Sequence, residues 1–236
     1  MKFVLTAAAL LVAPLVADAQ TLSCAVPNQV PQPHADLPSA GQPARRLPIA
    51  SYTLAISWSP EHCRTHGDDA GAAFQCGSDN RFGFVLHGLW PDGHGKQWPQ
   101  YCRSTAILPR QVIRQAMCAT PSAQLIQHEW SKHGTCMAGY TPQRYFARST
   151  AMYRRLRFPD MDALSRRPLT AGGLAQAIAR ANPGIGADMM RVIATRQGWL
   201  DEIWLCTDRG FRYRRCPAHQ GGLDPAAVVK VWRGRA

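Results

Sequence analysis

The chain alternates short runs of β-branched and aromatic residues with longer stretches that carry helix start and stop signals. The short runs predict β-strands at residues 52–58, 81–91, 191–206 and 211–216. The longer stretches predict helices at residues 108–119, 122–134, 141–158 and 170–184. Strands and helices follow one another in no regular order, and no glycine-rich phosphate turn follows a strand. We therefore predict an α+β fold with several helices packed on a mainly antiparallel sheet.

The N-terminal region differs from the rest of the chain. Residues 1–19 combine Lys2, an apolar run of 15 residues and small residues at positions 17 and 19, the pattern of a cleavable signal peptide. That run is shorter than the roughly 20 residues that span a bilayer, so we expect an exported protein, periplasmic or extracellular, with no membrane segment. Residues 20–48 contain six prolines and predict an extended tether, whereas residues 49–236 are expected to form a single domain.

Charge and cysteine content narrow the class of protein. The formal net charge is +12 at pH 7, which favours polyanionic partners such as nucleic acid, an acidic polysaccharide or an anionic surface. A basic secreted protein without such a partner is the alternative. All eight cysteines lie beyond residue 19, and an even number in an exported chain predicts up to four disulfides. No C-x-x-C pair occurs, which disfavours zinc-ribbon and thioredoxin-type sites.

Residues 128–136, HEWSKHGTC, gather chemically active side chains in one short stretch. Zinc hydrolases of the H-E-x-x-H type place two histidines four residues apart, but His128 and His133 are five apart, which on a helix rotates the second ring by about 140°. We therefore expect no metal ion and no cofactor. Spacing of four residues instead pairs Glu129 with His133 and His128 with Lys132. Such a cluster can hold a phosphodiester and transfer protons; the alternative is a solvated helix face.

A second segment, FVLHGLWPDG, contains His87 at the point where an apolar strand meets a glycine. From this position a side chain can project from the end of a sheet into a cleft. Trp90 and Trp98 follow within eleven residues, and flat aromatic faces suit base stacking, worth ~1–3 kcal/mol per base. Core packing is the alternative for both tryptophans, although the neighbours of Trp98 are polar.

Together the two segments resemble the active-site segments of the ribonuclease T2 family, exported ribonucleases that accept most bases. They occur in the family's order, with 40 residues between His87 and His128. Weaker likeness in YTLAISWSPEHC and LDEIWLCTD extends the resemblance over residues 52–216. Neither main segment departs from the family pattern at a catalytic position.

The resemblance implies a role for each catalytic side chain. His133 matches the general base that deprotonates the ribose 2′-hydroxyl, and His87 matches the general acid that protonates the departing 5′-oxygen. His128 matches a residue that contacts the phosphate, while Glu129 and Lys132 match the pair that supports the charged transition state. An unperturbed imidazole titrates near ~6.5, so one neutral and one protonated ring can coexist. The assignment of acid and base rests on the resemblance alone.

The resemblance also implies a substrate-binding region. Trp90, Asp92 and Trp98 match the family's first base pocket, an aromatic ring with a hydrogen-bonding carboxylate. The position of Trp98 varies between aromatic types in the family, so the base preference stays open. Leu125 stands where relatives often place a phenylalanine that stacks on the downstream base, and an aliphatic side chain there puts tight binding of that base in doubt.

Disulfide pairing follows in part from the resemblance. Cys102 with Cys136 resembles the family bridge that ties the segment after the first motif to the end of the active-site helix. Cys206 and Cys216 flank a predicted hairpin, and the family likeness supports their pairing. The other four cysteines admit three connectivities, among which we favour Cys24–Cys63 and Cys76–Cys118.

We therefore expect an exported, metal-independent endoribonuclease that cleaves single-stranded RNA through 2′,3′-cyclic phosphates to 3′-phosphates. RNA is the expected partner, DNA should be inert because it lacks the nucleophilic 2′-hydroxyl, and the protein is expected to be a monomer. Two alternatives stay open. A basic secreted binding protein would leave RNA intact, and a metal-dependent secreted hydrolase would be sensitive to a chelator.

Overall fold

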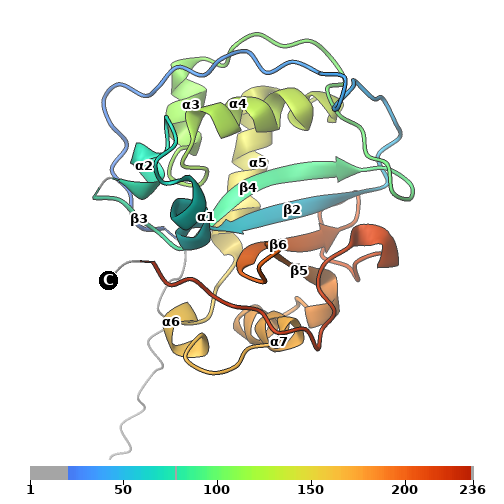
Figure 1. The fold of residues 1–236 in the computed structure, drawn as a ribbon. Helices are drawn as coiled ribbons and strands as arrows, with labels where there is room; N and C mark the ends of the chain where they lie inside the picture. The colour runs from blue at the N-terminus through green and yellow to red at the C-terminus, as the bar shows by residue number, and fades with distance from the viewer. Residues whose placement is uncertain (1–20, 78, 235–236) are drawn as a thin grey trace, which may run out of the picture.

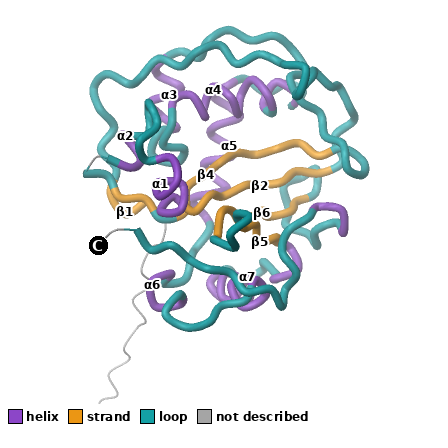
Figure 2. Tube along the Cα trace, in the orientation of Figure 1, coloured by secondary structure: helices purple, strands orange, loops and turns teal. Residues whose placement is uncertain are grey.

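A four-stranded antiparallel sheet forms the centre of the computed structural model, which describes residues 21–77 and 79–234 (Figures 1 and 2). Its strand order is β4-β2-β6-β5. The strands are β2 (Ser51–Trp58), β4 (Phe84–Asp92), β5 (Met190–Ala194) and β6 (Leu200–Thr207). A separate two-stranded sheet pairs β1 (Thr21–Ser23) with β3 (Arg81–Phe82). The predicted α+β fold with a mainly antiparallel sheet is confirmed, while the predicted signal peptide lies outside the described residues.

Helices lie beyond both edges of the central sheet and behind it (Figure 1). They are α1 (Ser59–His66), α2 (Ala73–Cys76), α3 (Arg110–Ala116), α4 (Ala123–Lys132), α5 (Pro142–Arg155), α6 (Met161–Leu164) and α7 (Ala171–Ala181). The side chains of Ser122 and Thr141 accept hydrogen bonds from the first turns of α4 and α5, so the predicted helix starts are confirmed. In residues 21–77 and 79–234, no helix has the length and apolar character needed to cross a membrane.

The two faces of the sheet differ in chemistry because successive side chains of a strand point to opposite sides. One face is part of the apolar core and holds Leu54, Ile56, Leu86, Leu89, Ile203 and Leu205. Against it, Tyr145 of α5 donates a hydrogen bond to the carbonyl of Leu89. The opposite face presents polar and aromatic side chains, namely Thr53, Ser57, Trp90, Asp92, Glu202 and Trp204. The sheet therefore supports a core on one side and carries a polar site on the other.

Several elements differ from the sequence prediction, among them β1, α2 and α6, which it did not contain. The predicted strand at residues 211–216 is wrong, because this segment makes only one isolated bridge, Thr207 with Tyr213. The Asp208 side chain accepts backbone hydrogen bonds from Gly210 and Arg212, which holds a turn in place of a strand. Helix α1 was missed because Pro60 was interpreted only as the end of a strand, whereas proline also suits the first turn of a helix.

Residues 24–48, here called the strap, cross over α3 and α4 to the far end of β4 (Figure 1). Val30 is 5% exposed and belongs to the core cluster. The Gln124 side chain of α4 accepts a hydrogen bond from the backbone N–H of His34. Arg45 and Gln100 exchange backbone hydrogen bonds at the other end. The strap is therefore packed along its length against the domain that follows it.

Four disulfides link the cysteines. The structure joins Cys102 to Cys136 and Cys206 to Cys216, the two pairs that the resemblance implies. The other two favoured pairs were wrong, since the bonds are Cys24–Cys118 and Cys63–Cys76. Helices α1 and α2 place Cys63 and Cys76 side by side, and the strap begins beside the end of α3. Neither α1 nor this path of the strap was predicted from the sequence.

The two corrected disulfides predict different losses of stability. In the chain-entropy model, replacing Cys24 and Cys118 by serine opens a loop of 94 residues and costs about 4–5 kcal/mol of unfolding free energy. The Cys63 and Cys76 double serine variant opens a loop of 13 residues and costs about 3 kcal/mol. Denaturant unfolding measures both losses, and non-reduced peptide mapping by mass spectrometry checks the pairing. Recovery of a Cys24–Cys63 peptide would contradict the structure.

Candidate active site

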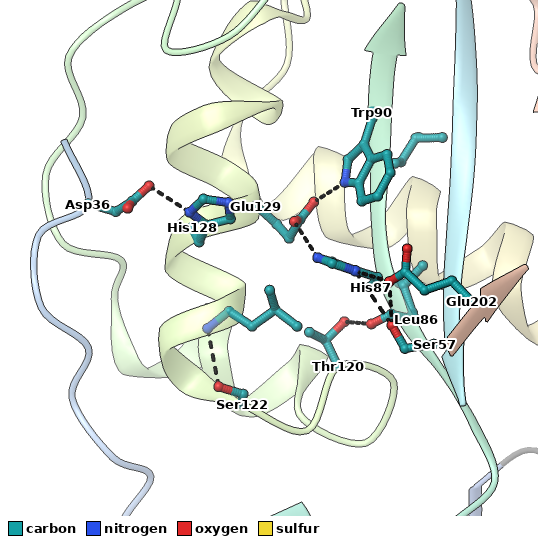
Figure 3. Close-up of polar contacts among 12 residues, drawn as sticks. Asp36, Ser57, Leu86, His87, Trp90, Thr120, Ser122, His128, Glu129 and Glu202 are labelled. Atoms are coloured by element: carbon teal, nitrogen blue, oxygen red, sulfur yellow. Dashed lines mark hydrogen bonds and ion pairs between the residues drawn. The ribbon is translucent and has the colours of Figure 1, made fainter. Parts of the chain in front are cut away.

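Three elements bring the predicted catalytic residues together on the polar face of the sheet. Strand β4 supplies His87 and Trp90, helix α4 with the residue after it supplies His128, Glu129 and His133, and β6 supplies Glu202 (Figure 3). The two sequence motifs meet because α4 lies alongside β4. A third contributor, β6, was not predicted to take part.

A β-bulge presents His87 to this site. In the register with β2, Gly88 pairs with Ala55 and Leu86 pairs with Ile56, which leaves His87 as the extra residue. Bulges bend a strand and redirect a side chain, and they are common beside active sites. The Nδ1 atom of His87 lies 3.5 Å from the Ser57 hydroxyl oxygen. The break that the sequence suggested near Gly88 is thus a bulge inside a continuous strand.

His87 lies between two buried carboxylates. Its Nδ1 is paired with Oε1 of Glu202, and its Nε2 lies 3.4 Å from Oε1 of Glu129. Burial by itself lowers the pKa of His87, but the charge and hydrogen bond of Glu202, followed by the charge of Glu129, outweigh it and raise this pKa to about 9. His87 is therefore protonated at neutral pH.

Glu202 is held as an anion by the same pair. Burial raises its pKa, but the charge and hydrogen bond of His87 and the hydrogen bonds of Trp204 and Ser57 lower it to about 2. The Ser57 hydroxyl donates to Oε1 at 2.8 Å and the Trp204 indole N–H donates to Oε2 at 2.5 Å. Glu202 thus supplies the fixed negative charge that keeps His87 cationic.

Glu129 projects from α4 onto the strand with almost no exposure to solvent. Its Oε2 accepts hydrogen bonds from the Trp90 indole at 2.9 Å and from the Tyr145 hydroxyl at 3.4 Å. Burial raises the pKa of Glu129 to about 7, against the lowering effect of the His87 charge. A Cβ on Gly88 would lie 1.7 Å from Glu129 Oε2, so only glycine lets the carboxylate approach the strand this closely.

His133 occupies the position just after α4. The helix ends at Lys132, and the Cys102–Cys136 disulfide fixes the turn that follows. The His133 ring stacks on Trp90 at a centroid distance of 5.4 Å, and its Nδ1 is buried without a hydrogen-bond partner among the described residues. Burial, and then the positive charges of Lys132 and the other histidines, lower the pKa of His133 well below its usual value. His133 is therefore neutral where His87 is charged.

Two predictions about the helical stretch were wrong. Glu129 directs its carboxylate to His87 and Trp90, so the predicted pair with His133 is not the contact that forms. The predicted wide separation of His128 and His133 also fails, because ligand atoms of His128, Glu129 and His133 lie within 4.8 Å of one another. Both errors assumed a helix through residue 133, whereas α4 ends at Lys132.

The surroundings of His128, Glu129 and His133 indicate whether these residues suit a metal ion. Their donor set, two imidazoles and a carboxylate, has the chemistry of a zinc site. However, the charges of Lys132 and His87 act on the same buried groups and oppose a bound cation. The Trp90 indole and the Tyr145 hydroxyl already hydrogen-bond one carboxylate oxygen of Glu129. The surroundings therefore favour an anion over a metal ion.

A cavity of about 290 Å³ opens beside His133. It is lined by the predicted base-binding residues together with Lys132, Trp204 and a C-terminal pair, the full set being Trp90, Asp92, Gly95, Lys96, Gln97, Trp98, Lys132, His133, Trp204, His219 and Gln220. Asp92 accepts hydrogen bonds from the hydroxyls of Thr53 at 2.9 Å and Ser51 at 3.3 Å. Burial raises the pKa of Asp92 to about 6. Trp98 is 44% exposed, so its ring is available to a ligand.

Leu125 is the predicted binding residue that lies apart from this cavity. It lies on α4, half-buried, one turn before His128. Its backbone N–H donates a hydrogen bond to the side chain of Ser122, which caps the helix. A larger cavity of about 1010 Å³ near Trp58, Arg64 and Trp232 contains none of the predicted site residues.

Sequence reasoning missed several side chains of the site. Asp36 of the strap contacts His128, Glu202 pairs with His87, and Tyr145 contacts Glu129. The others are Ser57, Trp204, His219 and Gln220. The sequence did contain a signal for Glu202, because this carboxylate lies inside LDEIWLC, a largely apolar segment that forms a strand of the sheet. No comparable signal marks Asp36, because the contact depends on the path of the strap.

The chain is similar to known ribonucleases in sequence and in fold. The model of the ribonuclease T2 family matches residues 49–216. The chain is 33% identical over 187 residues to a probable ribonuclease of Haemophilus influenzae, covering 75% of this chain and 64% of that protein. It is 32% identical over 165 residues to a ribonuclease of Aeromonas hydrophila, covering 67% of this chain and 71% of that protein. A solved structure of RNase NT in complex with 5′-AMP has a TM-score of 0.61 at 19% identity, covering 78% of this chain and 98% of that chain, and shows likeness of fold.

The two-carboxylate environment predicts that Glu202 controls the charge of His87. In Glu202→Gln, the pKa of His87 should fall from about 9 toward its ordinary value near ~6.5, because the largest raising effect is removed. An NMR titration of the His87 ring protons measures the change. Asp201→Asn is the matched control, since this neighbouring carboxylate raises the same pKa least among the named groups. Equal midpoints in the two variants would contradict the assignment.

Proposed function

Because the chain belongs to the ribonuclease T2 family, we propose that it is an endoribonuclease that cleaves single-stranded RNA by internal transphosphorylation without a metal ion. The observation that carries this proposal is the placement of two histidines in one site, with His87 between the carboxylates of Glu202 and Glu129 and the buried ring of His133 stacked on Trp90. His87 is kept charged between Glu202 and Glu129, while His133 is kept neutral by burial and by neighbouring positive charge.

The first step begins at His133. A neutral imidazole is the form that accepts a proton, so His133 is suited to deprotonate the ribose 2′-hydroxyl. The resulting oxygen attacks the adjacent phosphorus and displaces the 5′-oxygen of the next nucleotide. The product is a 2′,3′-cyclic phosphate. DNA lacks this nucleophile and should not react.

His87 completes the step as the acid. Its Nε2 faces the site on the side of Glu129, opposite the Nδ1 that Glu202 holds. Protonation of the departing 5′-oxygen leaves His87 neutral and His133 charged. In the second step the roles reverse, since neutral His87 accepts a proton from water and His133 returns one to the 2′-oxygen. Hydrolysis then gives a 3′-phosphate and restores both rings.

Positive groups suit the charge that develops on the phosphate. Lys132 lines the cavity beside His133, and His128 lies with its ring centroid 6.4 Å from that of His133. Cationic and hydrogen-bonding groups fixed in place before the reaction stabilise such a transition state. We propose that Lys132 and His128 contact the phosphate and that Glu129 positions His87 and Trp90.

We propose that the cavity lined by Trp98 and Asp92 receives a base of the RNA. The structurally similar RNase NT binds 5′-AMP. The exposed ring of Trp98 offers a stacking face, and Asp92 offers a carboxyl group whose protonation changes near pH 6.

The four disulfides suit an exported protein that acts in an oxidising compartment. We propose that it acts there as a monomer.

Substrate and metal dependence test the reaction. Purified protein in EDTA should cleave RNA and leave DNA intact, with 2′,3′-cyclic phosphates as the first products. His87→Ala and His133→Ala should each lower the rate by ~10²–10⁴-fold, the range for a lost general acid or base. His94→Ala, at an exposed histidine, is the control. Activity that requires an added metal ion, or that survives His133→Ala, would refute the mechanism.

The pH dependence of kcat/KM follows from the two pKa shifts. His87 must be protonated, so the rate should fall as pH rises through about 9. His133 must be neutral, and its pKa lies well below that of an ordinary histidine. On the acidic side, the rate should therefore fall only when the pH drops below the usual pKa range of a histidine. The predicted profile is a broad plateau across neutral pH. A narrow maximum with an alkaline midpoint near ~6.5 would show that His87 lacks the stabilising carboxylate.

A further inference from the structure

The strap places an acidic side chain on the histidine proposed to contact the phosphate. Oδ2 of Asp36 lies 3.2 Å from Nδ1 of His128 (Figure 3). The side chain of Asp36 is 19% exposed and that of His128 is 27% exposed, so solvent reaches both only in part. The negative charge of Asp36, after burial, also raises the pKa of the Tyr101 phenol to about 12.

We propose that Asp36 is a positioning residue that orients the His128 ring for contact with the RNA phosphate. A carboxylate on Nδ1 favours the ring form with a proton on that nitrogen, which leaves Nε2 free to face the site. The same arrangement orients histidines in metal and catalytic sites, where a second residue fixes the ring. This inference rests on the proposed function of the site.

The geometry of the ring supports an orienting role. The nitrogen of His128 that lies away from Asp36 points toward the helix surface that carries Glu129, and Asp36 stands on the far side of the ring from His87 and Glu202 (Figure 3). A donor atom of His128 lies within 4.8 Å of donor atoms of Glu129 and His133. Asp36 therefore contacts the side of the His128 ring that faces away from His87 and Glu202.

The strap is anchored on both sides of Asp36. Upstream, the Cys24–Cys118 disulfide and the hydrogen bond from His34 to Gln124 tie it to the helices. Downstream, the backbone pairing of Arg45 with Gln100 ties it to the segment before α4. Such double anchoring gives the carboxylate a defined position, whereas an acidic side chain on a free tail would not have one.

Several charged groups face His128 besides Asp36. Burial lowers its pKa, the charge and hydrogen bond of Asp36 oppose this, and the charges of Lys132 and His87 lower it further. The Tyr101 ring packs edge-on to it at a centroid distance of 6.5 Å. Glu129 has a carboxylate oxygen within 4.8 Å of a ring nitrogen of His128, but Asp36 is the carboxylate in direct contact with the ring and counteracts the cations around it.

Asp36→Asn tests the inference, because it removes the charge and keeps the size of the side chain. We expect KM for RNA to rise roughly 3- to 10-fold, the scale of one charge-assisted hydrogen bond, with kcat changed less than about twofold. The NMR titration midpoint of His128 should fall, since the carboxylate that favours the charged ring is lost. Asp36→Glu should restore part of both effects.

Leu37→Ala is the matched control, since this neighbouring strap residue is 67% exposed. It should leave KM and the His128 midpoint unchanged. If wild-type protein cleaves RNA and Asp36→Asn has the same KM and midpoint, the inference is overturned. If Asp36→Asn lowers KM, Asp36 repels the substrate and the inference is likewise overturned. If the wild-type protein itself fails to cleave RNA, the proposed function fails, and the His128 midpoint still decides whether Asp36 controls the ring.

Discussion

His87 and Glu202 form a partly buried ion pair, in which the His87 side chain is 28% exposed and that of Glu202 is 11% exposed, and each charge compensates the hydration that its partner loses. Hydrogen bonds from Ser57 and Trp204 satisfy the carboxylate. Glu129 adds a second carboxylate on the other side of the ring. The resulting cation in turn disfavours a proton on His133. The pair thus keeps His87 charged, and the charge of His87 adds to burial and to Lys132 in keeping His133 neutral.

The fold provides this pair through three local constraints. Strands β2, β4 and β6 lie side by side, which brings residues 87 and 202 together across a sequence separation of 115. The bulge turns the His87 side chain toward the polar face, and Gly88 leaves room for the carboxylate of Glu129. The Cys102–Cys136 disulfide then fixes the end of α4, where His133 leaves the helix.

The sequence predicted the elements better than their contacts. Local signals such as Ser122, Thr141 and the turn at Gly198 placed the main helices and strands within a few residues. Motif likeness identified the two segments that meet at the site, yet the predicted helix ran two residues past the end of α4 at Lys132, and the predicted partner of Glu129 was wrong. Glu202 and Asp36 were not predicted as site residues because their contacts depend on the order of the strands and on the path of the strap. The pairing of Cys63 with Cys76 depends on α1, a helix that was missed because Pro60 was interpreted only as the end of a strand. Long-range placement, therefore, is what local patterns do not encode.

The most direct measurement is the protonation state of the two rings in wild-type protein at pH 7, read from the ¹⁵N chemical shifts of labelled histidine. Spectra of single-histidine variants provide the assignment. The account predicts that His87 has a proton on both nitrogens and that His133 has a proton on only one. Two neutral rings, or a charged His133 beside a neutral His87, would contradict the claim that His87 is held as the acid and His133 as the base.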